Sequence, residues 1–158
     1  MINKYLSIFN FKIIISVAII FIIVRIFVGY VITVPTDSMQ PTLDNNSRYC
    51  VSKMYKEINR GDIVVFHRDG EIIDFVKRVI GLPGEHLELR DGKLYINSIA
   101  IEEPYIKYEG GIKDIDLFIP NNSYIVLGDN RSNSKDSRYW ENPFLDEDSI
   151  KGKVIFIN

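Results

Sequence analysis

The chain has 158 residues, with 19 Lys and Arg, 21 Asp and Glu, and a formal net charge of −2 at pH 7. This length favours one globular domain, and the small net charge excludes a general electrostatic attraction to nucleic acid. The single cysteine, Cys50, excludes an intramolecular disulfide and is expected to be a buried structural thiol in a strand.

The N-terminal segment is predicted to be a membrane anchor. Residues 13–24 carry no charge, and Ile8–Val28 supplies the roughly 20 residues that a transmembrane helix needs. Lys4 and Lys12 lie towards its N-terminal end, which indicates a cytoplasmic N-terminus. Arg25 then falls near the outer interface, where its long side chain can reach the headgroups. The segment therefore predicts contact with the lipid bilayer.

A cleaved secretory signal is the alternative for this segment, since its apolar core also fits a signal peptide. Such a signal should be followed by small residues at positions −3 and −1, and Gly29–Pro35 contains no such pair. We therefore favour a retained anchor, with the cytoplasmic N-terminus and a transmembrane helix in residues 1–28. Residues 29–158 are expected to form an extracytoplasmic domain at the cell membrane.

Short strands and tight turns are predicted in the rest of the chain. Two pairs of strands are each joined by an Asp-Gly dipeptide: Gly61–His67 and Ile72–Ile80 by Asp69-Gly70, and Leu87–Arg90 and Lys93–Ile96 by Asp91-Gly92. Such a dipeptide favours a two-residue hairpin, because glycine accepts the positive φ of the turn. Further elements are expected as strands at Gly29–Val34, Tyr49–Met54, Tyr124–Leu127 and Val154–Ile157, and as a helical turn at Asp146–Ser149 stopped by Gly152. The pattern predicts a mostly β, antiparallel domain.

Three polar clusters could carry chemistry: Ser38–Leu43, Lys77–Glu85 and Gly128–Arg138. Taken singly, each has an ordinary interpretation, as a turn serine, an exposed lysine and a polar loop. Lys77 departs from this interpretation, because it shares a strand face with Phe75 and Val79 by period-two alternation. An ammonium group on an apolar face loses solvation, which lowers its pKa.

A serine hydroxyl needs an adjacent base to act as a nucleophile, and serine–lysine pairs are a recurrent solution. A serine–histidine pair is the alternative, but His67 and His86 lie at predicted strand ends outside the serine-containing clusters. We expect surface roles for both histidines. No group of His, Cys and Asp residues has the spacing of metal ligands, so neither a metal nor a cofactor is predicted.

These clusters resemble those of the bacterial type I signal peptidases in their order and in their amino-acid sequence. The matching segments are Ser-Met-x-Pro-Thr-Leu, Gly-Asp-Ile-Val-Val-Phe, Lys-Arg-Val-Ile-Gly-Leu-Pro-Gly-Glu and Gly-Asp-Asn-Arg-x-Asn-Ser-x-Asp-Ser-Arg. The resemblance extends to the closing strand at Gly152–Phe156, and four such segments behind an N-terminal anchor are highly specific. It implies an antiparallel signal-peptidase-like core, in a short form similar to Gram-positive members.

The resemblance also implies the reaction, which is removal of signal peptides from exported proteins by a serine endopeptidase through an acyl-enzyme. Ser38 resembles the nucleophile and Lys77 the general base, with Ser134 bonded to the lysine and orienting it. The side chain of Thr36 and the backbone N–H of Ser38 resemble the oxyanion hole. Two structural ion pairs are implied around this site, namely Arg78 with Asp129 and Asp136 with Arg138.

Two features of the strands and loops bear on how a substrate would reach this pair. Gly128 lets the backbone come close to the serine and lysine, since glycine has no Cβ. The signal peptide is expected to bind in extended form along strand edges. The two edges that lead directly into catalytic positions are Ile32–Thr36 and Asp74–Arg78.

Two other functions remain open at this point. A self-cleaving repressor would share the serine–lysine pair, but it carries a DNA-binding module where this chain has an apolar segment. A non-catalytic or substrate-dedicated relative could act in the assembly of surface pili, although a non-catalytic one is expected to lose Ser38 or Lys77. Turnover of a signal-peptide substrate separates an enzyme from an assembly factor.

Overall fold

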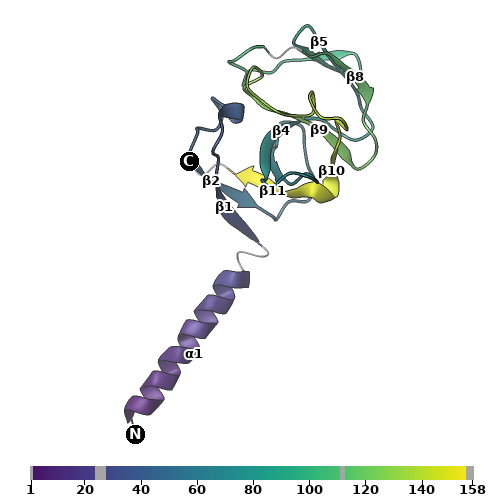
Figure 1. Ribbon diagram of the computed structural model, residues 1–158. Helices are drawn as coiled ribbons and strands as arrows, with labels where there is room; N and C mark the ends of the chain where they lie inside the picture. The colour runs from purple at the N-terminus through teal and green to yellow at the C-terminus, as the bar shows by residue number, and fades with distance from the viewer. Residues whose placement is uncertain (1, 24–27, 111–112, 156–158) are drawn as a thin grey trace.

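The computed structural model describes residues 2–23, 28–110 and 113–155. Helix α1 (Ile2–Ile23) projects away from a domain made of strands (Figure 1). Its side chains from Phe11 to Ile23 are exposed, and most of them are apolar. No helix within the described ranges combines the length and the hydropathy of a membrane span. The predicted span also includes Arg25, which lies outside the described residues.

A seven-stranded sheet forms the larger part of the domain. Its strands are β1 (Gly29–Thr33), β2 (Arg48–Ser52), β3 (Ile63–Phe66), β4 (Phe75–Gly81), β9 (Ser123–Leu127), β10 (Leu145–Asp146) and β11 (Ile150–Ile155). They lie in the order β1-β2-β11-β3-β4-β9-β10, and each neighbouring pair is antiparallel. The expected antiparallel architecture is therefore confirmed.

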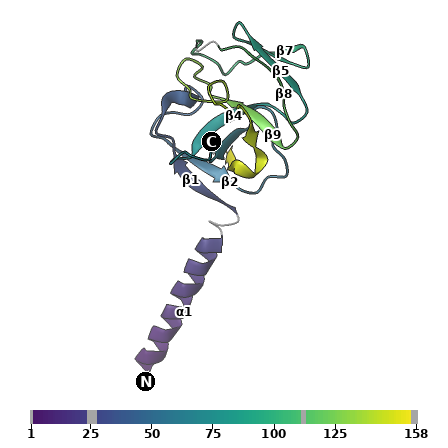
Figure 2. The ribbon, with the colours of Figure 1, turned by 45° about the vertical axis from the view of Figure 1, so that its right-hand side comes forward.

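A second sheet of four antiparallel strands lies beyond β4 and β9, on the side away from α1 (Figure 2). Its strands are β5 (His86–Arg90), β6 (Lys93–Ile96), β7 (Ile99–Ile101) and β8 (Ile115–Phe118), in the order β7-β6-β5-β8. Strand alternation gives this sheet one apolar face, carried by Leu87 and Leu89 on β5 and by Leu94 on β6. That face packs against Ile80 and Leu127 of the larger sheet.

The two predicted Asp-Gly hairpins have different outcomes. Arg90 faces Lys93 across a two-residue turn, with Asp91 at φ 52° and Gly92 at φ 76°, so this hairpin is confirmed. In the other case Phe66 is paired with Phe75, and residues 67–74 form a longer connection. The two-residue prediction there was wrong.

The longer connection has a physical reason. Asp69 and Gly70 do form a turn, in which Glu71 N–H donates to Arg68 O, but Ile72 behind it is 99% exposed and does not extend the strand. The strand ends are held from elsewhere. His67 N–H donates to Ser149 O beside β11, whose Lys151 contacts Asp74.

The C-terminal part of the sheet corrects two smaller predictions. The helical turn is a 3₁₀ turn, η3 (Glu147–Ser149), and it runs directly into β11. Gly152 lies inside β11, where an added Cβ would come within 2.6 Å of Ser52 O on β2, so this glycine allows close strand packing and does not stop a helix.

Cys50 lies on β2 and is partly exposed, although a buried thiol was expected. The last residues of the predicted strand Val154–Ile157 lie outside the described residues.

Candidate active site

Ser38 is presented by a short turn between β1 and β2. The 3₁₀ turn η2 (Asp37–Met39) buries Ser38, and Met39 and Leu43 anchor the segment in the core with no exposed surface. Asn130, in the loop after β9, holds the turn from the other side: its backbone N–H donates to Ser38 O at 3.1 Å, and its Nδ2 donates to Asp37 O at 3.2 Å. The serine is therefore fixed by two segments far apart in the sequence.

Lys77 approaches this serine from β4. Its Nζ lies 2.7 Å from Ser38 Oγ and donates to Val76 O at 2.9 Å. The residue is only 4% exposed. Its Nζ lies 5.9 Å from the centre of the Phe75 ring, and Val64 is directly opposite on β3. The lysine predicted to lie on an apolar strand face therefore does so.

The surroundings of Lys77 favour its neutral form. Burial lowers its pKa from 10.5 to about 8, against a smaller opposing effect from the carboxylates of Asp136 and Asp129. Burial acts in this direction because the charged ammonium is the form that loses most solvation. A neutral amine has a lone pair that can accept a proton from Ser38 Oγ.

Thr36, Ser134 and Gly128 surround the same serine. Thr36 Oγ1 lies 3.3 Å from Ser38 Oγ. Ser134 Oγ is buried and has no hydrogen-bond partner among the described residues, so the expected bond to Lys77 is not seen. A Cβ added at Gly128 would lie 2.3 Å from Ser134 Oγ and 2.5 Å from Ser38 O. The missing side chain of this glycine is what lets the three segments meet.

Both implied ion pairs are present beside the site. Arg78 donates to both carboxylate oxygens of Asp129, from Nε at 2.8 Å and from Nη2 at 2.6 Å. Arg138 forms the corresponding pair with Asp136, with Nε and Nη2 each at 2.8 Å. The second oxygen of Asp136 also accepts the backbone N–H of Gly128 at 2.9 Å. Such charged pairs are expensive to break because each partner is desolvated.

The two histidines lie apart from this arrangement. His67 contacts Asp74 at 3.1 Å at the end of β3, and His86 contacts Asp116 at 2.7 Å on the smaller sheet. Both contacts are exposed. Within the described part of the chain, no group of three or more His, Cys, Asp or Glu residues is arranged to hold a metal ion.

Four residues at or near the site were not predicted from the sequence. Thr42 donates to Asp129 and accepts from Arg78, and Tyr105 places its ring 4.0 Å from the Arg78 guanidinium carbon. Two others, Glu103 and Arg131, form a buried ion pair near the same loop. Thr42 and Arg131 lie inside recognised segments and could have been considered. Glu103 and Tyr105 lie between β7 and β8 and carried no sequence signal.

The comparisons with known proteins point to one protein family. Residues 7–158 match the protein family described as "Signal peptidase, peptidase S26". The chain is 38% identical over 167 residues to signal peptidase IB of Staphylococcus aureus, which covers 90% of this chain and 86% of that protein. It is 37% identical over 147 residues to signal peptidase I of Leptolyngbya laminosa, covering 84% and 70% of the two chains. A crystal structure of a signal peptidase I from Enterococcus faecalis V583 is similar with a TM-score of 0.55 and 36% identity, and it covers 63% of this chain and 98% of that one. The chain therefore belongs to the signal peptidase family, peptidase S26.

Proposed function

We propose that this protein is a membrane-bound serine endopeptidase that removes signal peptides from exported proteins. The observation that carries the proposal is the 2.7 Å contact between Lys77 Nζ and Ser38 Oγ, made by a lysine that is almost fully buried. The names of the relatives point to the same substrate class. They give no support to the alternative role in pilus assembly.

Lys77 serves as the general base in the proposed reaction. Its neutral amine takes the proton of Ser38 Oγ as that oxygen attacks the scissile carbonyl carbon. When the tetrahedral intermediate collapses, Lys77 gives the proton to the leaving amine, and the acyl group stays on Ser38. A water molecule, deprotonated by the same amine, then hydrolyses the ester and frees the serine. No step needs a metal or cofactor.

The remaining site residues are proposed to stabilise and orient this pair. The backbone N–H of Ser38 and the Thr36 hydroxyl stabilise the oxyanion, which is where charge develops in the transition state. Ser134 is proposed to bond to Lys77 Nζ during the reaction and so orient it, since its buried hydroxyl has no other partner among the described residues. The Asp129 and Asp136 ion pairs hold the loop that carries Gly128.

The substrate is proposed to bind as an extended segment between two strand edges. β1 is the outermost strand of the larger sheet, so one of its edges is open to a peptide, and the chain continues from its end at Thr33 to Thr36. β4 pairs with β9 only from Arg78 onward, which leaves Phe75–Lys77 unpaired on that side. An extended peptide can add to such edges through its backbone hydrogen bonds. Both edges end at the proposed catalytic pair.

Residues 1–28 are proposed to anchor this enzyme, with the catalytic domain in residues 29–158 outside the cytoplasm. The support is the exposed apolar surface of α1 from Phe11 to Ile23, together with Lys4 and Lys12 near its N-terminal end. Protease added to intact cells should digest the domain and spare a tag placed before Met1. A tag that is cleaved in intact cells would contradict this orientation.

The proposed catalytic pair is tested by cleavage of a signal-peptide substrate. Ser38→Ala and Lys77→Met should each lower kcat by at least about 10⁴-fold, because a nucleophile and its base act as a unit. Lys135→Met is the matched control, since Lys135 is an exposed lysine of the neighbouring loop, and it should keep wild-type activity. Full activity in Lys77→Met, or loss of activity in the control, would exclude the assignment.

A second test concerns the side chain before the cut. The proposed enzyme should require small residues at −1 and −3, as the family resemblance implies, so a peptide series with Ala, Ser, Leu or Phe at −1 decides it. We expect cleavage of the Ala and Ser peptides and a loss of at least about 100-fold with Leu and Phe, which a shallow site excludes sterically. Equal cleavage of the Leu and Ala peptides would contradict signal peptides as the substrate class.

A further inference from the structure

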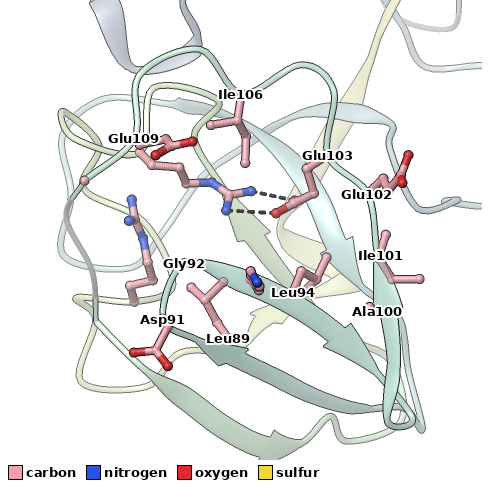
Figure 3. Close-up of a pocket in the computed structure, with 14 residues that line it drawn as sticks. Leu89, Asp91, Gly92, Leu94, Ala100, Ile101, Glu102, Glu103, Ile106 and Glu109 are labelled. Atoms are coloured by element: carbon pink, nitrogen blue, oxygen red, sulfur yellow. Dashed lines mark hydrogen bonds and ion pairs between the residues drawn. The ribbon is translucent and has the colours of Figure 1, made fainter.

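The segment after β7 reaches from the smaller sheet back to the loop that carries Gly128. Glu103 has a side chain that is 6% exposed, and its carboxylate pairs with both terminal nitrogens of Arg131, at 2.6 and 3.1 Å. Figure 3 shows the Glu103 carboxylate with these two contacts at the wall of a cavity of about 480 Å³. A bidentate pair of this kind fixes the guanidinium in both position and plane.

The anchored Arg131 in turn holds the backbone at the proposed active site. Its Nε donates to Gly128 O at 3.1 Å, while the Gly128 N–H donates to Asp136 at 2.9 Å. Both polar backbone groups of this glycine are therefore bonded to buried charged side chains. Since the same glycine packs against Ser38 O, a shift of its backbone would move the serine turn.

Tyr105 extends the same connection to the lysine strand. Its hydroxyl donates to Glu103 Oε1 at 2.7 Å, and its ring lies 4.0 Å from the guanidinium carbon of Arg78. Burial, and next the nearby Glu103 carboxylate, raise the pKa of the Tyr105 phenol, so this group remains a hydrogen-bond donor. Arg78 holds Asp129 and is the direct neighbour of Lys77 on β4.

We propose that Glu103 and Tyr105 are positioning residues for the Ser38–Lys77 pair, an inference that rests on the proposed proteolytic function. Glu103 acts through Arg131 on the Gly128 backbone, and Tyr105 acts through Arg78 on Asp129. A backbone bridge between Tyr108 and Asn130 joins the same two segments. The segment between β4 and β9, which forms the smaller sheet, thereby contributes to catalysis without touching the substrate.

The first test measures kcat and KM of the full-length protein in detergent, on a signal-peptide substrate, well below the Tm of each variant. Glu103→Gln leaves Arg131 without its counter-charge, so kcat should fall about 10- to 100-fold as the Gly128 backbone shifts. KM should change less than about twofold, because the strand edges are intact. The neighbouring Glu102→Gln is the matched control and should match wild type, since Glu102 is exposed. Should Glu103→Gln not fold, Glu103→Asp should show the same loss of kcat to a smaller degree.

The second test measures how kcat/KM depends on pH in variants of Tyr105. Tyr105→Leu removes the ring that holds the Arg78 guanidinium in place, so Arg78 should pair less closely with Asp129. The less neutralised Asp129 carboxylate should then raise the pKa of Lys77 further. The acidic limb should then move to higher pH. Tyr105→Phe keeps the ring and should keep the wild-type limb. A purely structural role would lower the Tm of the Tyr105→Leu variant without moving the limb.

Hydrogen exchange separates this inference from the reaction itself. The Gly128 and Asn130 amides are bonded to Asp136 and Ser38, and Glu103→Gln should make both exchange faster than Glu102→Gln does. Unchanged exchange, together with unchanged kcat and an unmoved limb, would overturn the positioning role. Full activity in Lys77→Met would instead refute the proposed reaction, and the exchange result would still decide whether Glu103 holds the loop.

Discussion

The two sheets bury different kinds of side chain. Buried polar and charged residues gather on the larger sheet and its loops: Ser38, Lys77, Arg78, Ser123, Asp129, Asn130, Arg131, Asp136, Ser137 and Arg138. The described strand residues of the smaller sheet bury only apolar side chains, such as Leu87 and Ile96, and its segment after β7 adds the buried carboxylate of Glu103. Desolvated charges are expensive and persist where geometry or reactivity requires them. The larger sheet thus carries the reaction, and the smaller one mainly supports it.

The largest effect is expected when a buried charge of the larger sheet is neutralised. Asp129→Asn leaves the buried Arg78 unpaired and should lower the free energy of unfolding by about 3–5 kcal/mol. Because the Asp129 carboxylate raises the pKa of Lys77, its loss should also shift the acidic limb of kcat/KM to lower pH. Denaturant unfolding and a pH–rate profile measure the two effects. A loss below about 1 kcal/mol would mean that this pair is no more important than a surface pair.

The burial of Lys77 should itself destabilise the fold. Its pKa falls from 10.5 to about 8 on folding, which costs about 3 kcal/mol below about pH 8, where both the folded and the unfolded chain hold the proton. The pKa is depressed, so stability rises with pH between about 8 and 10.5, where the unfolded state binds more protons. Lys77→Met should therefore be more stable than wild type below pH 8, with a gain that shrinks towards pH 10.5. A variant less stable than wild type at neutral pH would contradict the burial of this lysine.

Two glycines give a matched comparison between the sheets. Gly128→Ala places a Cβ against Ser134 Oγ and Ser38 O, so kcat should fall about 100-fold as the loop shifts. Gly92→Ala, in the turn of the smaller sheet, meets no atom within 4 Å but has φ of 76°. It should cost about 1 kcal/mol of stability through backbone strain and leave kcat unchanged. Equal effects on kcat would remove the distinction between the two regions.

The smallest effect is expected on the outer face of the smaller sheet. Arg90 is paired with Glu88 at 3.6 Å and its side chain is 59% exposed. Arg90→Gln should change the free energy of unfolding by less than about 1 kcal/mol, because exposed pairs are screened by solvent. Cleavage of a signal-peptide substrate should match wild type. A marked loss of activity would show that this face takes part in function.

Local sequence patterns predicted part of each sheet, and contacts between distant segments decided the rest. The antiparallel class was predicted from two hairpins, β9 from the continuous apolar run Tyr124–Leu127, and the position of Lys77 among apolar neighbours from alternation. The β5–β6 hairpin follows from Asp91-Gly92, whereas Asp69-Gly70 misled because tertiary contacts of His67 and Asp74 set the strand ends.

The site residues show the same division between those that the sequence predicted and those that depend on distant contacts. Resemblance supplied Ser38, and the contact of this serine with Lys77 is seen. The roles of Glu103 and Tyr105 depend on contacts with residues far along the chain, and no local spacing encodes such contacts. The bond expected between Ser134 Oγ and Lys77, which is not seen among the described residues, likewise depends on how a distant loop meets β4.

The pH dependence of kcat/KM for the wild-type enzyme tests the central claim most directly, because its acidic limb reports the pKa of the free enzyme's base. If Lys77 is the base, the limb should lie near pH 8, where burial places this pKa. A limb near about 6.5 would indicate a histidine, and one near about 10.4 an unburied lysine. Either result would contradict a neutral, buried Lys77 as the base for Ser38.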